Sequence, residues 1–419
     1  MAAVVVPSVV PHVLQESAQK SPAISNACEW WKAIKILMHA PGEEISIATF
    51  HPTAALFEKF VPVEKAREEH RAYAKLLEDK GALVYQVVDV LLQGTDKPGK
   101  ELEDLQELAF RSSSYTYSAD FSERDRLKQE EYRRKVVDEM TPQELVRTIM
   151  LRPAVHLEKT GRNTGLTPTY SMSPMANTYF LRDQMITTEK GVVIGKMNSP
   201  QRAPETEVIK FVLNKMGIKP VCQIEGEGRL EGGDFIPADK IAFIGQGLRT
   251  NAIAIKQLIE QDAFGQVDFV AVVKDPRQDQ TQMHLDTYFN IIDSKKAVLI
   301  ETRCHEKGKA PEIATFADIY ARDKAGKHTL VKENIDFVDY VKDGLGFDLI
   351  PVSNDDQLKY GVNFLTVESN KLLGIDGVSQ EYKDRLKAKG VEVKWMDFRG
   401  LTAGYGAAHC TTQVLLREK

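Results

Sequence analysis

Short apolar segments alternate with longer amphipathic segments along most of this chain, and this alternation limits the fold more than any other feature. Residues 33–38 and 82–88 have the composition of buried strands. The segment 64–81 between them has apolar residues at helical spacing and ends at Gly81, a common helix stop. We therefore expect an α/β fold with buried strands. The same order returns later, with strand patterns at 191–197 and 268–273 and a helical pattern at 205–216.

Two segments depart from this alternation. Between about residues 98 and 165 the strand patterns disappear, and highly charged stretches with apolar residues at helical spacing replace them. We expect a helical insertion at 98–165 within a catalytic domain at 33–419, preceded by an N-terminal tail at 1–32. A solvated helical hairpin without a role of its own stays open for the insertion. Its apolar residues are sufficient for a small core: Leu105, Leu108, Val136, Val137, Leu145 and Ile149.

The bulk composition excludes several classes of protein. The net charge of −5 over 419 residues leaves no basic excess to neutralise phosphates, so we expect no nucleic-acid partner. No apolar run approaches the ~20 residues that a membrane-spanning helix needs. The four cysteines are widely spaced and form no Cys-x-x-Cys pair, which is typical of free thiols in a reducing compartment. We expect a cytoplasmic protein without membrane contact.

Cys410 follows a glycine-rich loop near the end of the chain. A cysteine thiolate is a strong nucleophile, and Gly404 and Gly406 permit close approach of a ligand. The adjacent His409 would point to the opposite side on an extended strand, so it is not automatically the partner of the thiol. A lone cysteine is more often a small buried residue than a catalyst. A catalytic role for Cys410 therefore depends on partners from elsewhere in the sequence.

His284 and Asp286 are two residues apart, which on an extended segment places both side chains on one face. An imidazole exchanges protons near neutral pH, and a nearby carboxylate can hold a cationic substrate. A purely structural histidine is the alternative interpretation of this pair.

Glu231 and Asp234 enclose two glycines, so both carboxylates can line one pocket, although a surface turn is the alternative. The preceding residues begin like a dinucleotide-binding motif. We reject that interpretation because Glu231 replaces the third glycine and no clean buried strand precedes the segment. One further stretch, 177–183, offers an amide, a guanidinium and a carboxylate just before a strand pattern. Together the segments supply a nucleophile, a general acid/base and several carboxylates, which suits attack on a cationic carbon.

In this order the segments resemble the arginine deiminase branch of the guanidine-modifying enzymes, which also include amidinotransferases and dimethylarginine hydrolases. The order and spacing agree over about 33–415, and the 98–165 segment is similar to the insertion of arginine deiminases. The matching blocks are Asn-x-x-Phe-x-Arg-Asp at 177–183, Leu-Glu-Gly-Gly-Asp at 230–234, Met-His-Leu-Asp-Thr at 283–287, the glycine-rich loop ending at Cys410, His-Ala-Pro-Gly-Glu at 39–43, Arg202-x-x-Glu205 and Gly-Leu-Arg-Thr-Asn at 247–251.

The resemblance implies a five-bladed, pseudo-symmetric α/β-propeller with the active site on its central axis. It implies hydrolysis of L-arginine to L-citrulline and ammonia through a covalent thiouronium on Cys410, with His284 as general acid and base and with no cofactor or metal. Asp183 and Asp286 would clamp the substrate guanidinium, and Glu231 would orient His284 or join the clamp. The remaining implied roles are recognition of the α-carboxylate of arginine by Asn177, Arg202 and Arg249, and support from behind the site by Asp234.

The chemistry of these residues agrees with that role. A guanidinium is a poor electrophile because its charge is delocalised, so paired carboxylates must fix its plane against the thiol. A cationic substrate and a nearby imidazolium would favour the thiolate form of Cys410. The expected partner is thus a small guanidine compound, and assembly into a homo-oligomer stays open.

The loop before Cys410 departs from the family pattern. We expect an arginine close to the cysteine in many arginine deiminases, whereas the nearest preceding arginine here is Arg399. This departure leaves the substrate open, and the chain could be a deiminase of another guanidine compound.

Three different functions stay open beside hydrolysis of a guanidine. The first is an amidinotransferase that passes the amidino group of arginine to an amine, and the second is a binding protein that kept the pocket. The third is a metal-dependent ureohydrolase with His284, Asp286, Glu231 and Asp234 as ligands. The single histidine among those ligands disfavours the ureohydrolase.

Overall fold

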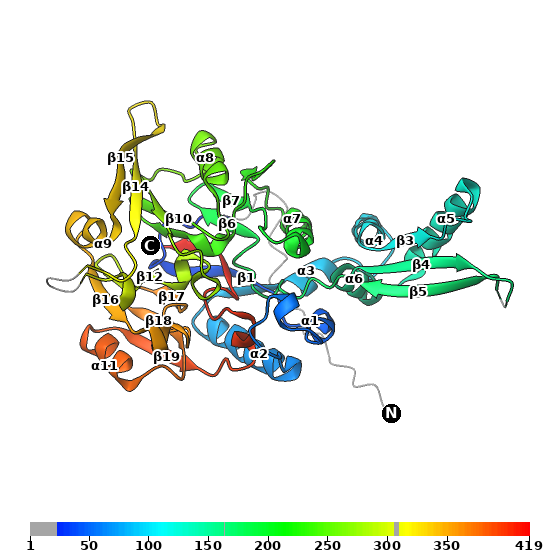
Figure 1. Ribbon diagram of the computed structural model, residues 1–419, viewed down its shortest axis with the longest axis horizontal. Helices are drawn as coiled ribbons and strands as arrows, with labels where there is room; N and C mark the ends of the chain where they lie inside the picture. Colours follow the sequence, from blue (N-terminus) through cyan, green and yellow to red (C-terminus); the bar gives the residue numbers. More distant parts are fainter. Residues whose placement is uncertain (1–22, 163, 306–309) are drawn as a thin grey trace.

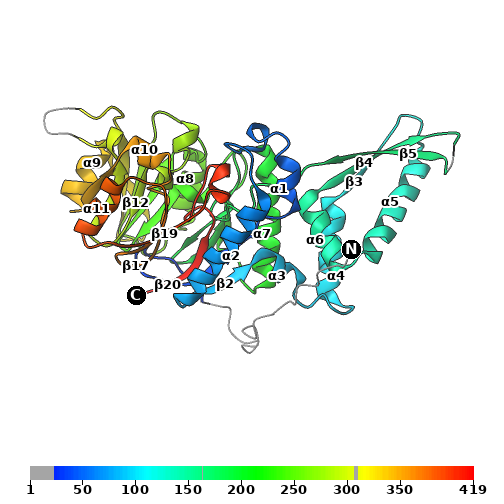
Figure 2. The ribbon, with the colours of Figure 1, turned by 90° about the horizontal axis from the view of Figure 1, so that it is seen from below.

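A computed structural model describes residues 23–162, 164–305 and 310–419 of the chain. Small β-sheets and helices form a main body, and an elongated arm extends from it (Figures 1 and 2). The predicted α/β class is confirmed.

Five sheets of the main body repeat one pairing pattern. In each sheet a first strand pairs antiparallel with a second, and the second pairs parallel with a third. The first strand therefore lies at one edge of its sheet. In the order first, second and third strand, the sheets are β20 (Gln413–Glu418), β1 (Lys32–Met38) and β2 (Leu83–Gln86); β6 (Met185–Thr188), β7 (Gly191–Ile194) and β8 (Cys222–Gln223); β9 (Phe235–Ala238), β10 (Ile241–Gln246) and β11 (Phe269–Lys274); β12 (Phe289–Ile291), β13 (Lys296–Ile300) and β16 (Asp348–Val352); and β17 (Leu365–Glu368), β18 (Lys371–Ile375) and β19 (Glu392–Met396). The sheet of β9 continues beyond β11 with β14 (Phe316–Arg322) and β15 (His328–Asp336).

A helix connects the second strand of each sheet to the third, as a parallel pair requires. These helices bury one apolar face, as α2 does with Tyr73 and Leu77. The sequence predicts two of these helices, at 64–81 and 205–216, but the predicted strand at 82–88 ends at Gln86, and Val87 begins the short helix α3 (Val87–Leu92). The connecting helices are α2 (Val63–Asp79), α7 (Ala203–Lys215), α8 (Ala252–Glu260), α9 (Phe337–Asp339) and α11 (Gln380–Ala388), while α1 (Glu43–Ala48) precedes α2 in the connection from β1 to β2 and α10 (Asn354–Gln357) lies between β16 and β17.

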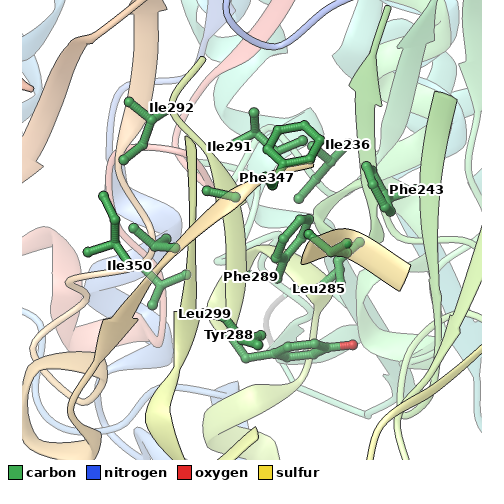
Figure 3. Close-up of a cluster of buried hydrophobic side chains, with 14 of the residues drawn as sticks. Ile236, Phe243, Leu285, Tyr288, Phe289, Ile291, Ile292, Leu299, Phe347 and Ile350 are labelled. Carbon is green, nitrogen blue, oxygen red and sulfur yellow. The ribbon is translucent and has the colours of Figure 1, made fainter. Parts of the chain in front are cut away.

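Apolar side chains from neighbouring sheets pack together and hold the strand edges in place. In one cluster, Phe243 of β10 and Phe289 of β12 meet edge to face with ring centroids 5.3 Å apart (Figure 3). Both rings are fully buried, as is Leu285 in the turn before β12. Burial of each such side chain stabilises the fold by about 1.5–3 kcal/mol. The packing therefore fixes the positions of the loops that precede the first strands.

The arm lies between β2 and β6 in the sequence and contains both helices and a sheet (Figures 1 and 2). The helices lie where the sequence predicts them, whereas the sequence does not predict the sheet. Its strands β4 and β5 keep most side chains exposed or half-buried, so their sequences lack the apolar alternation of a covered strand. The elements of the arm are α4 (Lys100–Ser112), β3 (Ser114–Tyr117), α5 (Glu123–Glu139), α6 (Pro142–Leu151), β4 (Pro153–Lys159) and β5 (Leu166–Met172).

The residues just before β1 pack into the main body. The backbone N–H of Ser25 donates to Leu415, that of Asn26 to Thr188, and that of Glu29 to Pro237. Most of the predicted tail at 1–32 lies outside the described residues, but its last part crosses three sheets and is buried at Asn26 and Glu29. Among the described residues, no helix combines the length and the apolar character that a bilayer span requires.

Candidate active site

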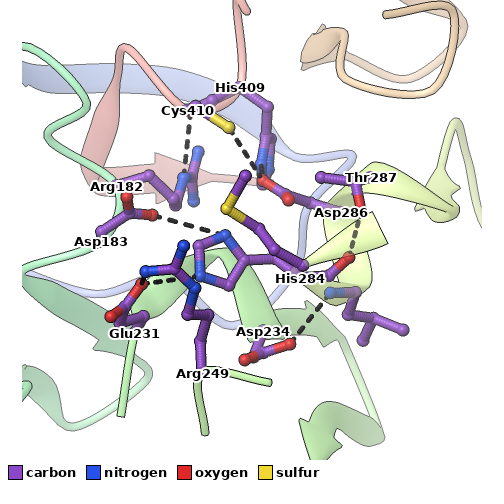
Figure 4. A network of polar contacts seen from close by, with 12 residues as sticks. Arg182, Asp183, Glu231, Asp234, Arg249, His284, Asp286, Thr287, His409 and Cys410 are labelled. Atoms are coloured by element: carbon purple, nitrogen blue, oxygen red, sulfur yellow. Dashed lines mark hydrogen bonds and ion pairs between the residues drawn. The ribbon is translucent and has the colours of Figure 1, made fainter. Parts of the chain in front are cut away.

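The predicted site residues lie in loops that lead into the first strands of the sheets. Residues 177–183 precede β6, Glu231 precedes β9, His284 precedes β12 and Cys410 precedes β20. The first strands are neighbours in space; for example, the Gln413 side chain of β20 donates to Thr187 Oγ1 of β6 at 2.7 Å. The loops therefore converge, and segments far apart in the sequence form one buried cluster (Figure 4).

The nucleophile candidate Cys410 is buried, and its loop is tied to the loop before β17. The backbone N–H groups of Ala407 and Cys410 both donate to Asn363 Oδ1, at 3.0 and 3.3 Å. A Cβ on Gly406 would lie 2.4 Å from a ring carbon of Phe180 and 2.9 Å from Cys410 Cβ. The glycine is therefore required for the loop to pass between these two side chains.

The electrostatic surroundings of Cys410 oppose its ionisation. The thiol donates to Asp286 Oδ2 at 3.7 Å. Burial raises the pKa of the thiol well above its ordinary value, and the charges of Asp286 and Asp183 raise it further. Without a bound cation, Cys410 is a neutral thiol.

His284 lies between two carboxylates. Its Nε2 is 3.0 Å from Glu231 Oε2, and its Nδ1 is 3.7 Å from Asp183 Oδ1. A Cβ on Gly233 would lie 2.5 Å from Nδ1, so only glycine leaves room for the ring. Burial lowers the pKa of the imidazole, but the charge of Asp183, the hydrogen bond to Glu231 and the charge of Asp234 together raise it to about 9. His284 is therefore a cation at neutral pH.

Glu231 is fully buried and ionised. Its Oε1 accepts the backbone N–H of Asn198 at 2.9 Å, and its Oε2 lies 4.0 Å from Arg202 and 3.8 Å from Arg249. Burial would raise the pKa of this carboxyl, but the hydrogen bond from His284 and the surrounding positive charges lower it to about 2. Glu231 can thus orient His284 and stabilise its charged form.

Asp183 is held by an arginine. The Arg202 NH1 group donates to Asp183 Oδ2 at 2.8 Å, and its NH2 group donates to Glu205 Oε2 at 2.9 Å and to the carbonyl of Asn177 at 3.3 Å. The other oxygen, Asp183 Oδ1, has no hydrogen-bond partner among the described residues. Since it is buried beside His284, it is available to a ligand donor.

The two remaining predicted carboxylates, Asp286 and Asp234, make different contacts. Asp286 lies in the turn Leu285–Thr287 rather than on the extended segment that the sequence predicted, and its Oδ1 has no hydrogen-bond partner in the described parts of the chain. Asp234 accepts the backbone N–H of Leu285 at 2.9 Å, and neither Asp234 nor Asp286 is among the described residues that line the cavity. Burial raises the pKa of Asp234 to about 7.

Arg249 and Asn177 also line the cavity. Arg249 NH2 donates to Gln280 Oε1 at 3.0 Å, while its Nε has no hydrogen-bond partner within the described residues. The Asn177 amide donates to the carbonyl of Ala55 at 2.8 Å. The cavity has a volume of about 20 Å³, which is room for about one water molecule. Its lining is formed by Leu56, Asn177, Phe180, Asp183, Arg202, Arg249, Gln280, Met283, His284, Gly404, Tyr405 and Cys410.

Comparison with known proteins places this geometry in a family. The family model described as "Arginine deiminase" matches residues 54–417. The chain belongs to the arginine deiminase family. Similar proteins include the arginine deiminase of Halobacterium salinarum, which is 25% identical over 96% of this chain and 98% of its own length, and that of Limosilactobacillus fermentum, which is 26% identical over 91% and 96%. The family predicted from the motifs is thereby confirmed.

Solved structures share the fold of this arginine deiminase family member at low sequence identity. Dimethylarginine dimethylaminohydrolase from Pseudomonas aeruginosa, complexed with citrulline, has a TM-score of 0.53 at 14% identity and covers 91% of this chain and 99% of its own. The N-terminal domain of ArgZ, a cyanobacterial arginine dihydrolase bound to its product, has a TM-score of 0.55 at 13% identity, with 92% and 98% covered. The amidinotransferase SxtG from Microseira wollei has a TM-score of 0.55 at 12% identity, with 94% and 98% covered.

Sequence reasoning misses two side chains of this family member that hold the nucleophile loop. Asn363 has no motif around it, and only its position before β17, which corresponds to the other site loops, could have indicated it. His409 is not indicated because an extended strand would place its side chain opposite that of Cys410, whereas residues 408–411 form a turn. It nevertheless contacts the site from behind, with Nδ1 2.6 Å from Asp286 Oδ2.

The buried groups closest to a metal-like arrangement are Asp183, Glu231 and His284. They do not fit a metal centre well, because Arg202 already donates to Asp183 and His284 lies as a cation between both carboxylates. A metal ligand must be a neutral imidazole. The four-ligand set of a ureohydrolase is also not assembled, since Asp234 and Asp286 lie apart from this group.

Proposed function

We propose that this chain hydrolyses the guanidinium group of L-arginine to give L-citrulline and ammonia through a covalent intermediate on Cys410. One observation carries the proposal: a thiol, an imidazole, a carboxylate and two arginine side chains line one small cavity. Such a cavity suits a molecule with a cationic and an anionic end. Arginine has a guanidinium and an α-carboxylate at these two ends.

At the reactive end, Asp183 Oδ1 and Asp286 Oδ1 are the two buried carboxylate oxygens free of hydrogen bonds among the described residues around the thiol. A guanidinium N–H donated to each would fix its plane beside Cys410. The same contacts would neutralise the two charges that raise the pKa of the thiol. Substrate binding therefore favours the thiolate, and the thiol proton leaves to solvent as the cation enters.

The chemical steps then follow from the positions of Cys410 and His284. The sulfur attacks the guanidinium carbon and forms a tetrahedral adduct. The His284 imidazolium donates a proton to one nitrogen, the C–N bond breaks, ammonia leaves, and a thiouronium remains on the sulfur. Neutral His284 then removes a proton from water, whose oxygen attacks the same carbon. The C–S bond breaks and the proton of the new hydroxyl group leaves to solvent, which releases neutral citrulline and restores the thiolate. No step requires a cofactor or a metal.

Arg249 has an unpaired Nε–H within the described part of the site, and Asn177 lines the same cavity. We propose that these groups, with Arg202, bind the α-carboxylate of arginine. Arg202 also holds Asp183, and Glu231 orients His284, so both residues act on the reactive end through their partners. Asp234 supports the turn that carries His284 through Leu285.

The present cavity is too small for arginine, so its wall must move to admit the substrate. Tyr405 and Leu56 line the cavity in left-handed backbone conformations, with φ of 70° and 63°. Such conformations are costly for non-glycine residues. We propose that these two loop residues move on substrate entry. Tyr405 then contributes to the choice among guanidine compounds.

The test is incubation of the protein with arginine, followed by measurement of citrulline and ammonia and by mass spectrometry of the Cys410 peptide. Equal amounts of both products and a mass increase on that peptide are expected. Cys410→Ala should form neither, whereas Cys304→Ala, which removes a cysteine outside the cavity, is the matched control. Transfer of the amidino group to an added amine would instead support an amidinotransferase, and turnover of a different guanidine alone would change the substrate.

We also propose that the five similar sheets are the blades of a pseudo-symmetric propeller with the site on its axis. The shared pairing pattern and the contacts between first strands support this arrangement. Domain boundaries at 33–419 and 98–165, a homo-oligomer and a cytoplasmic location stay predictions. The four unpaired cysteines agree with a reducing compartment.

A further inference from the structure

A row of buried ionisable groups lies beneath the nucleophile, and two of them, Glu29 and His409, take no part in the steps above. The ring of His409 stands between two carboxylates, with Nδ1 2.6 Å from Asp286 Oδ2 and Nε2 3.3 Å from Glu29 Oε1. All three side chains have no exposed surface. Asp286 Oδ2 in turn accepts the thiol of Cys410 at 3.7 Å (Figure 4). A contact path therefore leads from Glu29 to the sulfur.

Glu29 enters this row from the opposite end of the first strands. The site loops lie before these strands, whereas the segment that carries Glu29 bonds to residues at or near their other ends, including Thr188 of β6 and Pro237 of β9. Backbone hydrogen bonds of 3.0 and 2.8 Å fix this segment to the two strands. The Glu29 carboxylate is therefore held in place independently of the substrate side.

The charge of Glu29 is also fixed. Arg417 NH2 donates to Glu29 Oε1 at 2.7 Å, and Arg417 NH1 donates to the carbonyls of Thr366 and Trp31. Burial raises the pKa of Glu29, but the charge of Arg417 and the contact with His409 lower it to about 2. An ionised carboxylate thus faces His409 Nε2 under all ordinary conditions.

We infer that Glu29 is a positioning residue of the active site, which fixes the ring of His409 so that Nδ1 stays on Asp286 and Asp286 stays beside Cys410. A ring with one fixed nitrogen can turn about its side-chain bond, whereas a ring held at both nitrogens cannot. Both nitrogens face carboxylate oxygens, so the ring has a fixed contact on each side. The role of Asp286 in this inference rests on the proposed function.

The decisive experiment is a double-mutant cycle of Glu29→Gln and His409→Asn, with kcat and KM for arginine measured in each variant. Glu29→Gln keeps the shape of the side chain and the contact with Arg417 but removes the charge. If Asp286 is displaced from Cys410, kcat should fall roughly ten- to hundredfold. The change in KM should be smaller, because the α-carboxylate contacts are retained. The double variant should be no slower than the slower single variant, because both changes break one path.

The matched control is Glu44→Gln, since Glu44 and His39 form a second buried Glu–His pair with the same 3.3 Å separation. This change should leave kcat unaltered. The inference would be overturned if the fold-changes in kcat of Glu29→Gln and His409→Asn multiply in the double variant. It would also be overturned if a folded Glu29→Gln variant keeps the wild-type kcat. Should Glu29→Gln not fold, Glu29→Asp keeps the charge but withdraws it from His409, and wild-type kcat in that variant would be equally damaging.

A second readout does not depend on arginine turnover. Alkylation of Cys410 by iodoacetamide, followed by mass spectrometry, should be faster in Glu29→Gln, because a displaced Asp286 opposes the thiolate less. An unchanged alkylation rate would contradict the positioning role. If the wild-type protein does not convert arginine, the proposed function fails, while a changed alkylation rate still supports the role of Glu29.

Discussion

Replacement of Glu231 by glutamine tests the electrostatic basis of the site most directly. The change keeps the size of the side chain, and its amide oxygen can still accept the backbone N–H of Asn198, which lies 2.9 Å from Oε1. The amide nitrogen would then face His284 Nε2, where it can donate only to an unprotonated nitrogen. The variant therefore removes the charge that stabilises the imidazolium and favours the neutral ring.

The magnitude follows from the pKa of His284, which rises from 6.5 to about 9. At ~1.4 kcal/mol per pH unit, the carboxylates stabilise the imidazolium by about 3 kcal/mol beyond the cost of its burial. Three carboxylates share this effect, and Glu231 alone among them forms a direct hydrogen bond. We expect Glu231→Gln to lower the pKa of His284 by at least about one pH unit.

The assay is an NMR titration of the histidine ring protons in a Cys410→Ala background, with the His284 signal assigned from a spectrum of His284→Gln. The alkaline limb of the kcat profile should move to lower pH by the same amount, because protonated His284 is the acid of the first step. Glu227→Gln is the control, since its side chain is 85% exposed and lies outside the cavity. An unchanged His284 titration in Glu231→Gln would refute the reasoning.

Three further predictions concern the nucleophile, the substrate and acid stability. Cys410→Ala should abolish citrulline formation while the melting temperature stays close to that of the wild type; substantial residual activity would exclude the covalent mechanism. Arg249→Ala should raise KM for arginine more than it lowers kcat if its free Nε–H binds the α-carboxylate as proposed; an unchanged KM would remove Arg249 from the site. The ionised form of Glu29, whose pKa is lowered from 4.5 to about 2, stabilises the fold above pH 4.5, and this contribution is lost as the pH falls toward 2. Urea unfolding between pH 5 and pH 2 should therefore show a shallower pH dependence in Glu29→Gln than in the wild type, and parallel curves would contradict this.

Much of the reactive chemistry could be predicted because it is encoded in short contiguous motifs. The nucleophile, the imidazole and the carboxylates each stand in a segment with characteristic neighbours, such as the glycine that leaves room for His284. The strand and helix patterns were equally readable, since burial on one face leaves a periodic trace in the sequence. The strands of the arm left no such trace because their faces are exposed.

The supporting residues could not be predicted from local sequence. Asn363 and Glu29 stand in segments without a motif, and their importance comes only from which atoms of other loops lie within reach. For His409 the expected extended geometry is not found, because residues 408–411 form a turn and both its ring and the Cys410 thiol contact Asp286 Oδ2. The relevant partner, Asp286, lies 123 positions away in the sequence.

The sequence by itself determined the chemical groups, the α/β class and the family. The tertiary structure decided the protonation states of these groups and which other residues hold them in place. A pKa depends on burial and on charges within a few ångströms, so the neutral Cys410 thiol and the cationic His284 follow only from the packing of five loops. The closed cavity is likewise a property of side chains brought together from distant segments, which no single stretch of sequence specifies.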